Sequence, residues 1–287
     1  MKDIALVTDT TVNMPPALAA RLDLTIVPVY VTFGDKSYKD TDELPAEKFY
    51  AMLADLKARG GELPKTSQPS PGDFQHTYRT LAQRGVKHII SIHVTAKSSG
   101  TVNSALIGSE MVKDVDVHVV DSATTSMQMG YMLLEAHRSL EAGKGLKGAL
   151  DAIEKVKANS GLYFTVTEVE HLSASGRTTG ADKVAEAEIK VRPVVGILDG
   201  KPVVISPERT QRAAIDKVIE LTRDRMKGLA IKGVTVVHAN ALDRAEALKA
   251  RVPAGLGYAG EVYVVDFGPA LAVHFGPGML GLTAYGE

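Results

Sequence analysis

The sequence predicts an α/β protein with two domains, of which the first carries a doubly wound, mostly parallel sheet. Short apolar, β-branched runs alternate with helical patterns through the first half of the chain. The second half contains Asp199-Gly200 between two apolar runs, a pattern typical of a β-hairpin. The length of 287 residues also exceeds what one hydrophobic core usually holds.

The strands and helices of the first half follow from its hydrophobic pattern. Apolar runs predict strands over residues 4–8, 24–33, 86–94 and 115–120. Apolar stripes with helical spacing predict helices over residues 45–59 and 146–158. Helices are also expected over residues 15–22, where prolines suit a first turn, and over residues 99–113 and 127–141. A further helix is expected after Ser70, because Ser is a preferred N-cap and Pro71 suits a first turn. This alternation indicates parallel βαβ units.

The second half has a different pattern and is predicted to form an α/β domain with a β-hairpin. Strands are expected over residues 162–166, 192–206 (the two arms of the hairpin), 234–238 and 262–267. Helices are expected from residue 206 onward and over residues 242–251. The Ala-Asn-Ser-Gly break at residues 158–161 predicts the boundary between the two domains, which are therefore 1–159 and 160–287.

Composition excludes several classes of protein. The chain has no cysteine, which excludes a disulfide framework, a thiolate zinc site and a cysteine nucleophile. The net charge is -1 without a basic stripe, so no nucleic-acid partner is expected. The sequence has no apolar stretch of about 18 residues, and its N-terminus does not resemble a signal peptide. We therefore expect a cytoplasmic protein without a membrane span.

Hydroxyl side chains follow the carboxyl ends of three predicted parallel strands. They occur at residues 8–11, 94–101 and 120–122, and ligands of such sheets bind beyond these strand ends. Ser98, Ser99, Gly100 and Thr101 open a predicted helix, and Thr66 and Ser67 precede the helix that Ser70 caps. Free N–H groups at a helix N-terminus favour an anion, although the same hydroxyls also fit ordinary helix caps.

Two further residues are candidates for contact with an anion. His274 is predicted in a rigid turn with Gly276 and Gly278, after a final strand, where its ring can donate a hydrogen bond to a carboxylate or phosphate. Arg177 follows Gly176 in a predicted turn of the second domain. Either residue also fits an ordinary structural role, as a buried histidine or a solvated loop arginine.

Enzymatic readings stay open from the residues alone. Ser99, His274 and Asp9 compose a conceivable hydrolytic triad, although the chain lacks a GxSxG motif. The helix start at Ser99-Gly100-Thr101 suits a phosphoryl-transfer enzyme if Asp9 and Asp121 converge. Residues 255–260 match GxGxxG but follow a helix and precede a strand, which is the wrong order for dinucleotide binding. A third reading is an interaction module with a vestigial pocket.

Eight motifs in a fixed order carry a family resemblance. They are residues 7–11, residues 38–40, residues 65–69, residues 99–105, residues 120–122, Gly176-Arg177, Arg192-Pro193 with Asp199-Gly200, and residues 274–278. Together, over essentially the whole chain, they resemble the DegV family of fatty-acid-binding proteins.

This resemblance implies that the protein binds one long-chain fatty acid, such as palmitate or oleate, with its carboxylate between the domains. Thr66, Ser99 and His274 match the carboxylate-binding residues of the family. Supporting roles fall to Ser67, Ser98, Gly100, Thr101, Asp9 and Arg177. The acyl tail is expected in the apolar interior of the second domain.

The resemblance also implies partners. Some members present the bound acid to a separate ATP-dependent fatty acid kinase, which makes an acyl phosphate for phospholipid synthesis. We therefore expect a fatty acid as ligand and a kinase as protein partner, with no cofactor, no metal ion and no catalysis by the chain itself.

Overall fold

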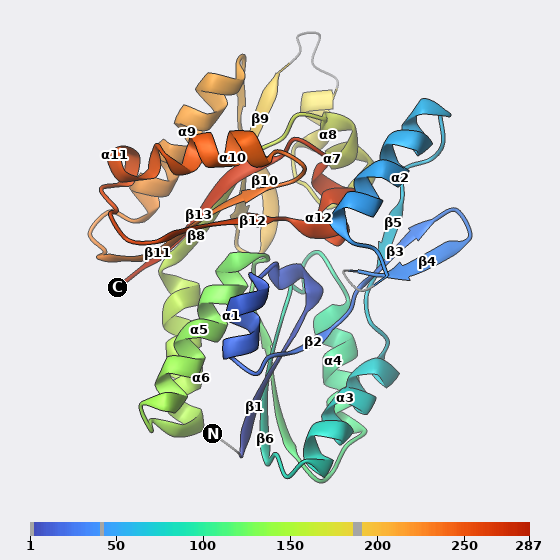
Figure 1. Cartoon of the computed structure of the whole chain (residues 1–287), viewed down its shortest axis with the longest axis vertical. Helices are drawn as coiled ribbons and strands as arrows, with labels where there is room; N and C mark the ends of the chain where they lie inside the picture. The colour runs from blue at the N-terminus through green and yellow to red at the C-terminus, as the bar shows by residue number, and fades with distance from the viewer. Residues whose placement is uncertain (1–2, 41–42, 186–190) are drawn as a thin grey trace.

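Four parallel strands form the sheet of the first half of the chain, in the order β2-β1-β6-β7 (Figure 1). The computed structural model describes residues 3–40, 43–185 and 191–287. The strands are β1 (Ile4–Asp9), β2 (Thr25–Val27), β6 (His88–His93) and β7 (Asp116–Asp121). A short 3-10 helix, η1 (Thr10–Val12), continues β1, and the helix α1 (Pro16–Arg21) leads to β2.

Helices cover both faces of this sheet, which confirms the doubly wound architecture (Figure 1). On one face lie α3 (Pro71–Gln83) and α4 (Thr101–Glu110), and on the other lie α5 (Met127–Glu141) and α6 (Gly145–Ala158). Ser70 caps α3 as predicted, because its hydroxyl accepts the Asp73 N–H while the Asp73 carboxylate accepts the Ser70 N–H. These helices leave the carboxyl ends of the strands uncovered.

The strand predicted over residues 24–33 is wrong as a single element. Pro28 has no N–H to continue a ladder, and the chain leaves the parallel sheet there. It enters a small antiparallel sheet of order β4-β3-β5, next to the helix α2. The elements are β3 (Tyr30–Phe33), β4 (Lys36–Lys39), α2 (Ala46–Ala58) and β5 (Lys65–Ser67). Thr66, which precedes the helix that Ser70 caps, therefore lies in a strand opposite Val31.

A six-stranded mixed sheet forms the second half, in the order β10-β9-β8-β13-β11-β12. Its strands are β8 (Ser160–Thr165), β9 (Arg192–Leu198), β10 (Lys201–Glu208), β11 (Ile231–His238), β12 (Val262–Asp266) and β13 (Leu280–Gly286). The predicted hairpin is confirmed, and its turn residues Asp199 and Gly200 both have positive φ, at 47° and 77°. Three helices cover the outer face: α9 (Gln211–Arg225), α10 (Leu242–Lys249) and α11 (Val252–Leu256).

The central strand β13 escaped the sequence analysis. It pairs with β8 on one side and β11 on the other, so it holds the sheet together. Glycine at positions 281 and 286 weakens its strand pattern. Gly281 has a steric reason, since a Cβ there would collide with the carbonyl oxygen of Tyr163 in β8. The helix expected from residue 206 also starts later, because β10 runs to Glu208 and Thr210 caps α9.

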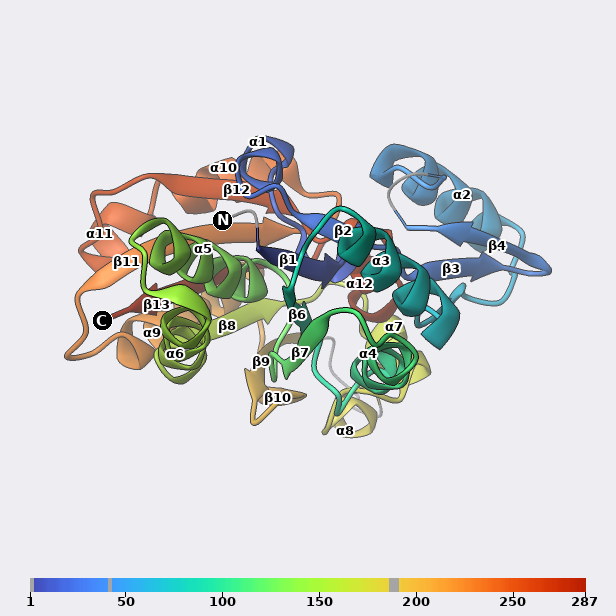
Figure 2. The same ribbon diagram turned by 90° about the horizontal axis from the view of Figure 1, so that it is seen from below.

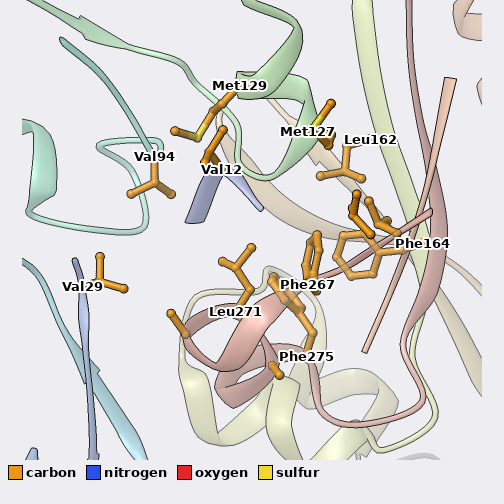
Figure 3. Close-up of a cluster of buried hydrophobic side chains, with 14 of the residues drawn as sticks. Val12, Val29, Val94, Met127, Met129, Leu162, Phe164, Phe267, Leu271 and Phe275 are labelled. Carbon is orange, nitrogen blue, oxygen red and sulfur yellow. The ribbon is translucent and has the colours of Figure 1, made fainter. Parts of the chain in front are cut away.

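The largest hydrophobic cluster joins the two large sheets. Figure 3 shows Val12, Val94 and Met129 from the first half facing Leu271, Phe267 and Phe275 from the second. The three buried rings of Phe164, Phe267 and Phe275 pack together, with centroids 4.8 to 5.9 Å apart. Because this core crosses residue 159, the division into domains 1–159 and 160–287 stays a prediction. No helix among the described residues is long and apolar enough to cross a bilayer.

Candidate functional site

A cavity of about 260 Å³ lies beyond the carboxyl ends of β1 and β6, between the two large sheets. The strand order reverses between β1 and β6, and such a switch point is where open α/β sheets bind ligands. Residues of both halves line the cavity: Thr11, Val29, Thr66, Ser67, Gln68, Val94, Thr95, Ala96, Lys97, Ser98, Ser99, Gly100, Thr125, Arg177, Ile197, Pro202, Ala270, Leu271, His274 and Phe275. This wall combines hydroxyl groups and the charged Lys97 and Arg177 with aliphatic and aromatic side chains.

His274 and Thr66 meet at the polar part of the wall, although 208 residues separate them in the chain. Nε2 of His274 lies 2.9 Å from the Thr66 hydroxyl, and both side chains line the cavity. The prediction of a turn around His274 is wrong. The residue lies in the last turn of the helix α12 (Gly268–Phe275), and the turn with Gly276 and Gly278 comes after it. A β-strand and a helix therefore fix this pair.

His274 is held neutral by its surroundings. Burial, together with the nearby Arg177 and His171, lowers the pKa of His274 to about 3. Its Nδ1 atom is buried without a hydrogen-bond partner among the described residues.

The loop after β6 supplies further hydroxyls. Ser98, Ser99 and Gly100 line the cavity, and the Ser98 hydroxyl is buried without a partner among the described residues. The Ser99 hydroxyl bonds to the Thr101 hydroxyl at 2.8 Å and accepts the Thr101 N–H. The helix predicted from Ser99 begins at Thr101, which is fully buried and does not line the cavity. Thr101 therefore supports Ser99 instead of facing a ligand.

Asp9 is a buried organiser and does not face the cavity. Its carboxylate accepts the N–H groups of Thr11 and Val94 at 3.0 Å each, and Nδ1 of His93 lies 3.0 Å away. The Thr11 hydroxyl donates to the same carboxylate. Asp9 thus connects the carboxyl ends of β1 and β6 through hydrogen bonds. The hydrolytic triad of Ser99, His274 and Asp9 is therefore not formed.

A paired-acid metal site is also not formed. Asp121 accepts the N–H groups of Ala96 and Ala123, and β6 separates its strand from that of Asp9. Within the described ranges, no group of three or more His, Asp or Glu side chains is placed to hold a metal ion.

Arg177 and Ser67 also line the cavity. The Arg177 guanidinium donates to the Ser175 carbonyl at 2.6 Å and, in the described part of the chain, makes no ion pair. Its positive charge therefore remains available beside the polar wall.

The hairpin was predicted, but its role at the site was not. The Thr95 hydroxyl donates to the Gly200 carbonyl at 2.7 Å, so the hairpin tip touches the loop after β6. Ile197 and Pro202, on either side of that tip, line the cavity. The Asp199-Gly200 pair predicts the turn, but no local sequence pattern indicates that the turn contacts the loop after β6.

Comparison with known proteins decides the family. The family model described as "Uncharacterised protein, DegV family" matches residues 3–287. The chain belongs to the DegV family. A DegV domain-containing protein of Halalkalibacterium halodurans is 33% identical over 287 residues, which is 100% of both proteins.

Solved DegV structures share the fold of this chain. A DegV family protein from Thermus thermophilus, described for its fatty acid binding, superposes with a TM-score of 0.91 at 30% identity, covering 99% of this chain and 100% of that one. DegV of Bacillus subtilis, described as a fatty acid binding protein, gives a TM-score of 0.87 at 28% identity, with 99% of each chain covered. The resemblance inferred from the motifs and the two-part α/β fold are therefore confirmed.

Because His274 is buried, we expect the free energy of unfolding of the protein to fall at acidic pH. Because the pKa of His274 is about 3 in the folded protein and near 6.5 when exposed, the unfolded chain binds the proton first as the pH falls. The folded protein should lose roughly 3 kcal/mol of unfolding free energy near pH 4 through this group. Urea unfolding of lipid-free protein between neutral and acidic pH measures the loss.

The matched variants are His274→Gln and His76→Gln. His274→Gln removes the titrating group and should flatten the acid limb of the profile, whereas the exposed His76 should leave it unchanged. Superimposable acid limbs for the wild type and His274→Gln would show that His274 is not held neutral by burial.

Proposed function

We propose that this DegV-family chain binds one long-chain fatty acid, with the carboxylate at Thr66, Ser99 and His274 and the tail between the two sheets. The observation that carries the proposal is the composition of the cavity wall. Hydroxyl groups and His274 line it together with aliphatic and aromatic side chains from both halves, and Lys97 and Arg177 add positive charge. The descriptions of the Thermus thermophilus and Bacillus subtilis relatives as fatty acid binding support it.

The polar part of the wall suits a carboxylate. The Ser99 hydroxyl and the Thr66–His274 pair, in which the Thr66 hydroxyl lies 2.9 Å from Nε2, offer hydrogen-bonding groups to a carboxylate. Gly100 precedes α4, so a ligand there also meets the positive end of a helix dipole. Ser67, Ser98 and Arg177 surround these groups and complete the proposed head-group site.

The tail supplies the affinity. Burial of about fourteen methylenes contributes roughly 11 kcal/mol before association costs, at about 0.8 kcal/mol each. Those costs remove a large part, because a bound ligand loses translational and rotational freedom. The remainder suffices for tight binding without a strong ion pair at the head group. The neutral donors therefore orient the carboxylate and contribute less to the binding free energy.

A site in which the tail supplies the affinity and the head-group residues orient the carboxylate suits a carrier better than a catalyst. An oxygen of a carboxylate held by neutral hydroxyls stays nucleophilic, and it can attack the terminal phosphorus of ATP bound to a partner kinase. The new bond forms the acyl phosphate, and ADP leaves with the electrons of the broken bond. We therefore infer presentation to a fatty acid kinase, in the cytoplasm where that nucleotide is available, with no cofactor of the carrier's own.

Presentation is tested by the double variant Thr66→Ala/Ser99→Ala. Because the tail supplies most of the affinity, palmitate binding should weaken by less than about tenfold, the worth of one or two neutral hydrogen bonds. Acyl phosphate formation by the fatty acid kinase of the same organism should fall by about a hundredfold or more, since a misplaced carboxylate loses its near-attack geometry. Trapping the acyl phosphate with hydroxylamine measures the rate.

The control removes two hydroxyls of the same kinds elsewhere. Thr80→Ala/Ser109→Ala deletes groups that bond only to carbonyls of their own helices, and it should leave the kinase rate unchanged. Full kinase turnover with the Thr66→Ala/Ser99→Ala protein would refute the role assigned to these hydroxyls.

A further inference from the structure

A second cavity, of about 480 Å³, lies on the other side of the space between the two sheets. Figure 2 shows α1, β2 and β12, which border it, on one side of the molecule, and β9 and β10, which border the first cavity, on the other. Its lining residues are Thr10, Val12, Asn13, Met14, Pro15, Pro16, Ile26, Pro28, Pro45, Ala46, Val264, Val265, Asp266, Gly268 and Pro269.

The two cavities lie back to back. Residues that are neighbours in the chain line different cavities in three separate segments. The residues that line the first cavity are Thr11, Val29 and Ala270. Their chain neighbours Thr10, Val12, Pro28 and Pro269 line the second cavity. The helix α12 contacts η1, so these segments form one continuous partition. The partition is therefore about one residue thick.

Flexible and apolar side chains fill this partition. Val12 lines the second cavity and belongs to the core cluster that faces the first, where it lies beside Met129 in Figure 3. Met14 also lines the second cavity and packs on the same cluster, and its methyl group lies near Gly130 of α5. An unbranched methionine changes rotamer at low cost, so Met14 is suited to open a passage.

The lining of the second cavity suits an acyl tail and not a head group. Prolines, valines and alanine predominate beside the neutral Thr10 and Asn13, and no lysine or arginine of the described residues lines it. Its one carboxylate, Asp266, already accepts the Gly268 N–H at 2.8 Å and the Tyr50 hydroxyl at 3.3 Å. A carboxylate ligand would meet repulsion there, whereas a hydrocarbon end would bury apolar surface.

The volume of the first cavity also indicates that a long acyl tail needs the second cavity. At about 260 Å³ it falls just below the range of about 300 to 1,000 Å³ that is usual for pockets of drug-sized ligands. A long acyl chain with its head at Thr66 and His274 therefore needs further apolar space. The back-to-back cavity of about 480 Å³ is the space that adjoins it.

We propose that the second cavity receives the methyl end of fatty acids too long for the first cavity, through a passage beside Val12 and Met14. This inference rests on the proposed function and adds to it that the acids with the longest chains are ligands. The second cavity then determines the upper limit of chain length, while the head-group residues serve acids of every length.

Filling the second cavity tests the proposal. Ala46 is half-buried at the start of α2 and lines the second cavity but not the first. Ala46→Phe should weaken the binding of arachidate by about tenfold, as expected when roughly two methylenes lose their burial. The affinity for myristate should stay within about twofold. Titration calorimetry with both acids measures the selectivity, and Ile26→Phe fills the same cavity from β2 if Ala46→Phe does not fold.

The matched control is Ala51→Phe, which adds the same ring to the exposed face of the same helix. It should leave both affinities unchanged. An equal ratio of arachidate to myristate affinity in the wild type and both filled variants would overturn the proposal. Failure of the wild type to bind myristate at all would instead overturn the proposed function, so the two failures are distinguishable.

Discussion

Replacing Ala270 by Phe should remove high-affinity fatty acid binding while the protein stays folded. Ala270 lies on α12, is 3% exposed and lines the first cavity. A benzyl group there occupies the space of the tail. If it displaces four methylenes, binding loses about 3 kcal/mol, which weakens affinity by roughly two orders of magnitude. Calorimetric titration with palmitate measures the effect.

The control for this prediction is Ala247→Phe, which places the same ring on the exposed face of α10. Its affinity should match that of the wild type. Because the Ala270→Phe side chain enters an existing cavity, the melting temperature of the ligand-free variant should change little. Wild-type affinity in a folded Ala270→Phe protein would place the tail outside this cavity.

Replacing Asp9 by Asn should destabilise the protein by about 3 to 5 kcal/mol, the usual cost of breaking a buried, hydrogen-bonded charge. Asp9 is fully buried, and both its oxygens accept hydrogen bonds from Thr11, His93 or Val94. An asparagine amide presents an NH₂ group to at least one of these donors. In a protein of this size the melting temperature should fall by about 6 °C or more.

A second readout connects this loss to the site. Asp9 holds Thr11 and Val94, both of which line the cavity, so palmitate affinity should also fall. The control is Asp55→Asn, which removes an exposed i,i+4 ion pair with Arg59 and should cost less than about 1 kcal/mol. Equal melting temperatures for the two variants would contradict the organising role of Asp9.

Much of the fold was predictable because local patterns dominate it. The apolar runs of β1, β6 and β7 need burial on both faces, which indicates a parallel sheet between helices. The Ser70 cap and the Asp199-Gly200 turn are short-range signals with one structural solution each. β13 was not predicted because glycines are typical of loops. Gly281 is required there because β8 leaves no room for a Cβ, which the local sequence does not indicate.

The candidate site was predictable only in part. Strand order places Ser98 and Ser99 at a carboxyl edge, and the hydroxyls there are visible in the sequence. The bond between Thr66 and His274 depends on the packing of α12 against β3 and β5, which no local pattern encodes. The orientation of the Asp9 carboxylate was likewise not predictable from the sequence, because an aspartate at a strand end can point to a ligand or to neighbouring backbone N–H groups.

The central claim is that the cavity between the sheets holds a fatty acid. Denaturing mass spectrometry of solvent extracts from freshly purified protein, without added lipid, tests it most directly, with Ala270→Phe purified in parallel. The account predicts a near-stoichiometric long-chain fatty acid in the wild-type extract and little in that of the variant. An extract without fatty acid, together with no thermal stabilisation by palmitate or oleate, would contradict the account.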